Sequence, residues 1–543
     1  AIDYLIIRRC FLLILLLAGA ARLGGVPGDF PGTDDKWQHF QSEHFEVYSR
    51  VRESDSRDLL HNLELLRATF LDSLKLVERR KLEVTVYVFK SQRDFQTYGS
   101  EAYGPRHQYD GFYVHGVDRA VIYLIPGEDR ETTRQMIFHE YIHHLFDVAE
   151  VTPPPWLNEG MADLFSTIAP VAGKLEFGRP LAGRLWQAQT ETLMPLDKLF
   201  GVDRDSPVFR QGAHTGLFYA ESWALMHYLY FGDSKIEPER RRRFIALAMR
   251  NSFRDGDQLR ASFRDVFKMD YPDMFARLQT YLTSGRYFWT KNAMPAIPPA
   301  SSYGMRAVPE SEMRLRLAEL ALRVSRAPAA KLMLMQAVER DPTEIRALEA
   351  LGAEALRDQD ELRARERWSQ AVERGTRNPA IYRELGLMEG RAVFSQFDVN
   401  YRVPAEKAQR MRRYLLRSIE FNPEQSAAYE MLAWVEAFAP EPSIKNVALV
   451  QRAYPNLTRQ ERTALALAFV RVRLDRKDEA MEILAGLETM KPDPWETSGI
   501  EAIRALIEKR PMHRTDAGRR SLEEASRVGT PPPKVGPIKA GSR

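Results

Sequence analysis

The sequence predicts an α+β domain followed by an all-helical repeat domain. In the first third of the chain, segments that alternate apolar and polar residues precede segments with helical spacing, an order typical of α+β folds. In the second half, short motifs recur every 34 residues. The chain has 543 residues, which is too long for one hydrophobic core. We therefore expect several domains.

The composition is that of a folded protein with no strong charge bias. Hydrophobic residues make up 44% and charged residues 28% of the chain. The 78 lysines and arginines nearly balance the 74 acidic residues, and no long basic stripe is present, which argues against a nucleic-acid partner. The densest basic run, Arg240–Arg243, is predicted to be the solvated face of a helix.

The N-terminal segment differs from the rest. Two arginines precede the apolar run Cys10–Ala20, which ends in small residues, a pattern typical of secretory signal peptides. The run is shorter than the about 20 residues of a membrane span. We expect residues 1–20 to be a signal peptide, residues 21–36 a linker, and the protein to be exported to the periplasm or the extracellular space. If the segment is retained, it would anchor the protein to a membrane. Export would remove Cys10, the only cysteine, so no disulfide is expected.

Residues 37–179 form the predicted α+β domain. The expected elements are a strand at His44–Arg50, a helix at Asp55–Val77, a strand at Leu82–Lys90, a hairpin at Gly111–Ile125, and helices at Thr132–Val148 and Leu157–Ile168 with Pro153–Pro155 between them. Within the hairpin, Arg119–Ile125 is either an ordinary sheet strand or an edge to which an extended peptide could add.

The remaining segments are predicted from composition and periodicity. Residues 180–290 should form a helical subdomain. Residues 291–309 are rich in Pro, Ala and Ser without periodicity, so we expect a linker. Residues 310–507 should be helical repeats, and residues 508–543 a disordered tail.

The repeat period appears in paired motifs. Ala337-Val338 recurs as Ala371-Val372, and Leu351-Gly352 recurs as Leu385-Gly386, each 34 residues later. This period, with a small residue in each helix and proline at the turns, resembles the tetratricopeptide family over about residues 311–440. The resemblance implies a solenoid whose concave surface could bind a protein partner.

The stretch from Met136 to Phe165 carries the chemistry. His139 and His143 lie four residues apart, on one face of the expected helix, and Glu159 lies in the next helix. Two histidines and one carboxylate are a standard catalytic zinc ligand set. We therefore expect these three residues to bind Zn²⁺.

Two further acids complete the expected site. Glu140 is too close to the histidines to coordinate in the same geometry and is placed to act as the general base that accepts a proton from the attacking water. Asp163, one turn after Glu159, is expected to accept the free N–H of a ligand histidine.

These residues resemble the gluzincin metallopeptidases. HEYIHH followed by WLNEGMAD is similar to the HExxH and NEGxA or NExxxD motifs of that group. SEHFEVYS, VTVYVF, GFY and FYAESWALMHYL are similar to the bacterial peptidase MA-like domain, which is often joined to tetratricopeptide repeats. The resemblance covers about residues 37–288 and implies a gluzincin-type fold. The spacing from His143 to Glu159 is slightly shorter than in the best-known families, which a loop can accommodate. The absence of the GxMEN motif, by which zinc aminopeptidases hold the substrate N-terminus, argues against an aminopeptidase.

Three residues are candidates for the group that stabilises the oxyanion. Tyr219 occupies a position similar to the tyrosine with this role in zinc aminopeptidases, and its alternative role is helix packing. His214 and His227 are rivals. His144 is expected to contact solvent or the site's surroundings, and Trp156 to be a core residue.

Two functions follow from this reading. The first is an exported zinc metallopeptidase that hydrolyses a peptide or protein, with a repeat domain that recruits a partner or the substrate. The second is a tetratricopeptide scaffold or adaptor that carries an inactive peptidase-like domain. The presence of Glu140 favours the first, since an inactive zinc fold needs no base there.

Overall fold

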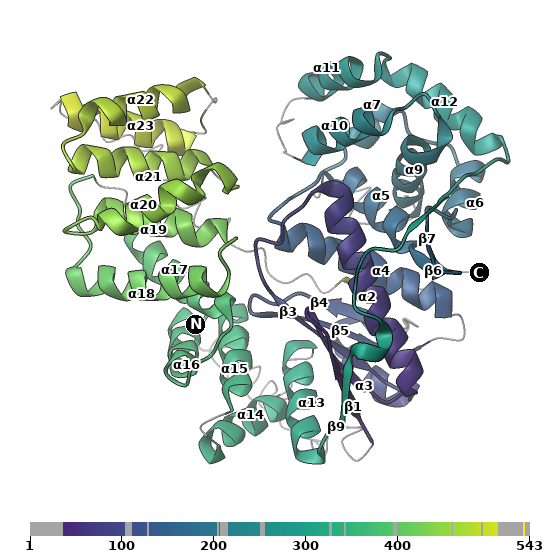
Figure 1. The fold of residues 1–543 in the computed structure, drawn as a ribbon, viewed down its shortest axis with the longest axis horizontal. Helices are drawn as coiled ribbons and strands as arrows, with labels where there is room; N and C mark the ends of the chain where they lie inside the picture. Colours follow the sequence, from purple (N-terminus) through teal and green to yellow (C-terminus); the bar gives the residue numbers. More distant parts are fainter. Residues whose placement is uncertain are drawn as a thin grey trace, which may run out of the picture.

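The computed structural model describes residues 36–103, 111–126, 130–203, 206, 215–249, 256–324, 328–341, 344–394, 399–458, 460–489, 492, 494–508 and 536–537. Over these residues the protein is a mixed α+β structure and mostly helical, as predicted (Figure 1). The predicted signal peptide, His214 and nearly all of the predicted tail lie outside the described residues. In the described part of the chain, no helix is long and apolar enough to cross a membrane.

A mixed sheet forms the centre of the first domain, with the strand order β10-β4-β5-β3-β2-β1-β9 among the described residues. β2, β3 and β5 are parallel neighbours, and the other pairs are antiparallel. The strands are β1 (Gln38–Gln41), β2 (Phe45–Ser49), β3 (Glu83–Val88), β4 (Gly111–Val114), β5 (Arg119–Leu124), β9 (Gly304–Ala307) and the two-residue β10 (Gly536–Pro537).

Both faces of this sheet are covered, which explains the nearly continuous apolar runs in its central strands. Val84, Val86 and Val88 of β3 point to one face and pack in the core beneath α2 (Glu53–Leu74) and α4 (Arg130–Val148). Tyr87 points to the other face and packs in a second core with α13 (Glu310–Val324). α3 (Gln92–Tyr103) also lies against this second face through Phe95.

The expectation that Arg119–Ile125 could be an edge strand is wrong. β5 lies between β4 and β3 and hydrogen-bonds to both, because the chain reverses at Gly116 and places β4 outside it. The predicted hairpin is confirmed, and β4 is the outer strand of the pair.

The helical subdomain expected at residues 180–290 packs against α5 (Pro155–Ser166). Its described elements are α6 (Ala182–Thr190), α7 (Leu196–Phe200), α9 (Thr215–His227), a π-helical turn (Tyr228–Gly232), α10 (Pro238–Met249), α11 (Gly256–Phe267) and α12 (Tyr271–Thr283). A small sheet of β6 (Ala169–Val171), β7 (Lys174–Phe177) and β8 (Thr290–Ala293) flanks it.

The segment 291–309 is not the irregular linker that its composition predicts. Its first residues belong to β8, which pairs with β7, and its later residues form β9, which pairs with β1 in the main sheet. Pro295, Pro298 and Pro299 lie between the two strands, so none of them interrupts a ladder of hydrogen bonds. The segment therefore ties the two sheets together.

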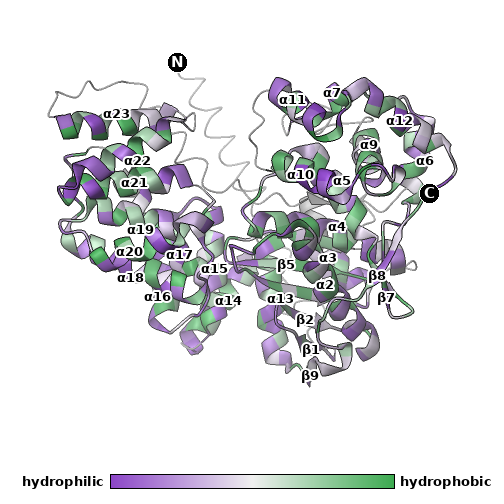
Figure 2. Ribbon diagram, turned by 45° about the horizontal axis from the view of Figure 1, so that its top comes forward, coloured by the Kyte–Doolittle hydropathy of each residue, from purple (hydrophilic) through white to green (hydrophobic). Residues whose placement is uncertain are grey.

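The described residues between 310 and 508 form stacked helices, in which hydrophilic and hydrophobic residues alternate (Figure 2). Two glycines 34 residues apart lie at close contacts within consecutive helix pairs. A Cβ on Gly352 would lie 2.4 Å from the ring of Trp368, and one on Gly386 would lie 2.6 Å from Leu415. After α13, the helices are α14 (Pro328–Arg340), α15 (Ile345–Arg357), α16 (Glu361–Glu373), α17 (Pro379–Phe394), α18 (Ala405–Phe421), α19 (Ser426–Phe438), α20 (Ile444–Ala453), α21 (Gln460–Arg473), α22 (Lys477–Thr489) and α23 (Pro494–Glu508).

Candidate metal centre

Two packed helices bring the predicted ligands together. α4 carries His139 and His143 one turn apart, and α5 (Pro155–Ser166) carries Glu159. Pro154 is the N-cap of α5 and Pro155 its first residue, a position that proline suits because the first helical N–H has no partner within the helix. The prolines that separate the two helices therefore also start the second one.

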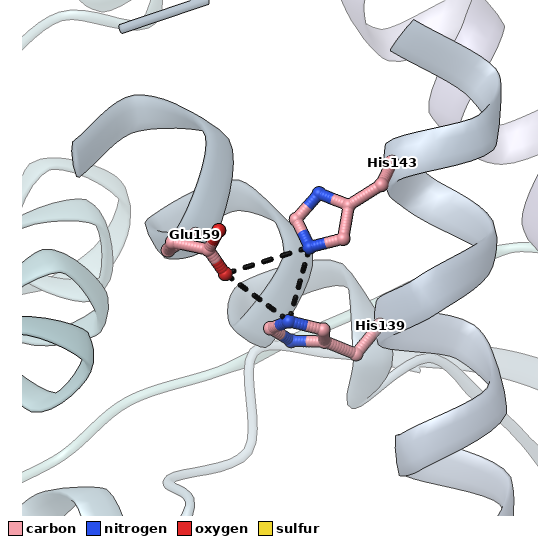
Figure 3. Close-up of side chains that lie close together, drawn as sticks. All are labelled: His139, His143 and Glu159. Carbon is pink, nitrogen blue, oxygen red and sulfur yellow. Dashed lines mark hydrogen bonds and ion pairs between the residues drawn. The ribbon is translucent and has the colours of Figure 1, made fainter. Parts of the chain in front are cut away.

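Three side-chain atoms converge on one point (Figure 3). The two Nε2 atoms of His139 and His143 are 3.2 Å apart, and Glu159 Oε2 lies 3.2 Å and 3.4 Å from them. Tetrahedral ligands at zinc bond lengths of about 2.0–2.1 Å are separated by about 3.3–3.4 Å. The spacing therefore fits three corners of a zinc-sized tetrahedron.

Burial and charge at this point also fit a cation. Glu159 Oε2 is buried and makes no hydrogen bond in the part of the chain that the structure describes. Burial lowers the pKa of His139, but contacts with Asp163 and Glu159 outweigh that effect and raise the pKa to about 10. Burial would raise the pKa of Glu159, yet His143 and His139 hold it below its usual value. The acids thus favour positive charge at this point, which a bound metal ion would supply.

Asp163 orients one of the two histidines. Its Oδ1 lies 2.8 Å from His139 Nδ1, which leaves Nε2 of the same ring directed toward His143 and Glu159. Arg184 of α6 holds the other carboxylate oxygen, with Nε donating to Asp163 Oδ2 at 2.6 Å. The sequence predicts Asp163 but not Arg184, which belongs to no motif and reaches the site only through the packing of α6.

Glu140 and Tyr219 stand beside the three ligands. Burial raises the pKa of Glu140, and the neighbouring His143 and His139 partly offset this rise. The ring of Tyr219 lies 6.4 Å from that of His139, between centroids, and the guanidinium of Arg184 lies 5.1 Å from the Tyr219 ring. Burial and then the charges of Glu159 and Glu140 raise the pKa of Tyr219, so its hydroxyl keeps its proton and can donate.

Close packing of α9 on α5 sets the position of Tyr219. A Cβ on Gly160, the residue after Glu159, would lie 2.5 Å from the Ser222 carbonyl oxygen and 2.6 Å from Met226 Cγ. Only glycine permits this approach of the two helices without a shift.

The rival His227 has a different role. Its Nε2 lies 2.8 Å from the Gly178 carbonyl oxygen and its Nδ1 lies 2.8 Å from the Tyr281 hydroxyl, so both ring nitrogens are occupied in a fully buried position. His227 is therefore a core histidine. The structure does not describe the second rival, His214.

The neighbouring residues His144 and Trp156 are both buried. The expectation that His144 could contact solvent is wrong, because its side chain is buried. Its Nδ1 lies 2.8 Å from the hydroxyl of Tyr113 in β4. It thereby links α4 to the outer strand of the hairpin. Trp156 is fully buried against Phe200 and Phe244, as predicted.

Comparison with known proteins gives no further guide. No protein-family model matches the chain, and no curated protein matches it.

Proposed function

We propose that this protein is an exported zinc-dependent peptidase. The observation that carries the proposal is the convergence of His139, His143 and Glu159 at tetrahedral spacing, with Asp163 behind one of the histidines. Zinc has this ligand preference and geometry, and when bound it polarises a carbonyl and activates water. The gluzincin-type arrangement that the motifs imply is part of the same proposal.

The chain's own residues would divide the remaining work. Glu140 would accept the proton of the attacking water and deliver it to the leaving amine. The raised pKa of Glu140, caused by burial, suits a group that must both accept and release this proton. Tyr219 would donate its hydroxyl hydrogen to the carbonyl oxygen as negative charge develops there. Asp163 and Arg184 would hold the ring of His139 in place.

We further propose that residues 310–507 form a tetratricopeptide-like solenoid. The support is the 34-residue period together with the two glycines that meet bulky side chains of their partner helices. Such repeats commonly bind a protein partner or present a substrate.

The test compares the purified chain with Glu140→Gln on a broad peptide library, each with and without a chelator. We expect cleavage by the wild type only, lost on chelation and restored by zinc. Glu131→Gln is the matched control, because Glu131 lies on the same helix with a side chain that is 60% exposed. Cleavage that survives both chelation and Glu140→Gln would overturn the proposal. Bound zinc without hydrolysis of any peptide would favour the scaffold alternative.

A further inference from the structure

Three large aromatic side chains protrude from the metal-bearing domain near α6. Trp186 of α6 is 66% exposed, and Phe288 and Trp289, just before β8, are 62% and 41% exposed. We call these three residues the aromatic patch. α6 lies against the segment that carries the other two, because Gln189 donates to the Leu282 carbonyl and bonds to the Tyr287 hydroxyl. Large exposed aromatic residues on adjoining elements indicate an interaction site.

The two chain segments that carry or adjoin the patch are rich in basic residues. In segments 169–191 and 283–293 the exposed charged residues are Lys174, Arg179, Arg286, Lys291 and a single acid, Glu191. The other acid in these segments, Glu176, is buried and paired with Arg179 and Lys291. Arg179 also lies over the ring of Trp289, at 5.4 Å from its centroid. The patch therefore combines aromatic rings with an excess of positive charge.

We propose that the aromatic patch and its basic rim bind the surface of an anionic membrane. Tryptophan rings settle at the headgroup level of a bilayer, and lysine and arginine are attracted to anionic lipids. A protein partner is a poorer match, since lysine is depleted at protein interfaces and two of the four exposed cations are lysines. The hairpin between β6 and β7 adds the exposed Val171 next to Lys174, again an apolar residue beside a cation.

Figures 1 and 2 place α6 and β7 on the side of the molecule away from helices α18–α23. α6 also links the patch to the metal centre, because Arg184 of this helix reaches Asp163 while Trp186 faces solvent. A membrane bound here would lie on the α6 side of that centre. This inference goes beyond the proposed function and does not depend on it, because binding is measured without turnover.

The test uses the full chain with Cys10→Ser and a single new cysteine that carries an environment-sensitive fluorophore. The label is placed at Phe288→Cys in the patch or at Leu362→Cys, an 80% exposed control position on α16. With vesicles of phosphatidylcholine and phosphatidylglycerol, we expect a blue shift of the emission at position 288 and none at 362. Because the readout is local, membrane binding by the N-terminal apolar segment cannot produce this difference.

A second variant tests the charge. Lys174→Glu with Arg286→Glu, added to the chain labelled at position 288, should raise the lipid concentration for a half-maximal shift about tenfold or more. Neither cation forms an ion pair among the described residues, so the fold should be retained, which circular dichroism checks. No shift at position 288, an equal shift at position 362, or no effect of the charge reversal would each overturn the proposal. A protein or polysaccharide ligand of the patch would give the first of these results.

Discussion

A buried ion pair joins the helical stack to the sheet. Arg323 of α13 donates to both carboxylate oxygens of Asp118, at 3.0 Å and 2.7 Å, and the two side chains are only 8% and 1% exposed. Replacing Arg323 with alanine would leave the Asp118 carboxylate buried without its main partner. Removal of one member of such a pair typically costs about 3–5 kcal/mol. We expect Arg323→Ala to lower the free energy of unfolding by this amount.

The measurement is urea denaturation monitored by circular dichroism. A multidomain chain need not unfold in one step, so the change in the free energy of unfolding is taken from the transition of the sheet domain. Arg242→Ala is the control, because its ion pair with Glu239 is on the surface, and it should cost less than about 1 kcal/mol. Replacing both buried partners, Asp118→Leu with Arg323→Met, should recover most of the loss, because no unpaired charge remains. If Arg323→Ala changes the stability by less than about 1 kcal/mol, the pair does not hold the two parts together, and the reasoning fails.

Two other predictions concern single side chains. Asp163→Asn should weaken zinc binding by about 10–100-fold, because His139 loses the charged acceptor that fixes its ring. The zinc affinity is measured by competition with a chromophoric chelator, and an unchanged affinity would contradict this role of Asp163. Burial lowers the pKa of His227 to about 4, so between pH 6.5 and 4 the unfolded chain binds a proton that the folded chain excludes. Stability should fall by up to about 3 kcal/mol as the pH drops through this window, and His227→Gln should remove that dependence in acid-denaturation curves.

The candidate ligands could be predicted from the sequence because their placement is local. The spacing of His139 and His143 fixes them on one helical face, and a short turn brings α5 and Glu159 back against α4. Asp163 follows from the same helix geometry. Arg184 could not be predicted in this way, since its position depends on how α6 packs on α9, which no periodicity in its own segment encodes.

The pairing of segment 291–309 with two sheets could not be predicted either. Its composition indicates an extended backbone, and an extended backbone serves equally as a linker or as an edge strand. Which of the two forms depends on the free edge of β1, about 260 residues earlier in the chain. Contacts at such separation are set by the tertiary fold, and a local sequence pattern carries no information about them.

The segment 291–309, expected to be a linker, therefore does not separate the helical stack from the first domain. One face of β3 and β5 supports α4, while the opposite face presents the buried rings of Tyr87 and Tyr123 to α13. A chain that ended before β9 would also lack α13, so it would expose these rings and lose β9 from the edge of the sheet. Because the same strands support α4 on their other face, we expect the first helices of the stack to help hold α4 in position. Later helices also contact the first domain, since Ala380 of α17 packs in the core that contains α4 residues and Asn422, after α18, donates to the Arg79 carbonyl oxygen.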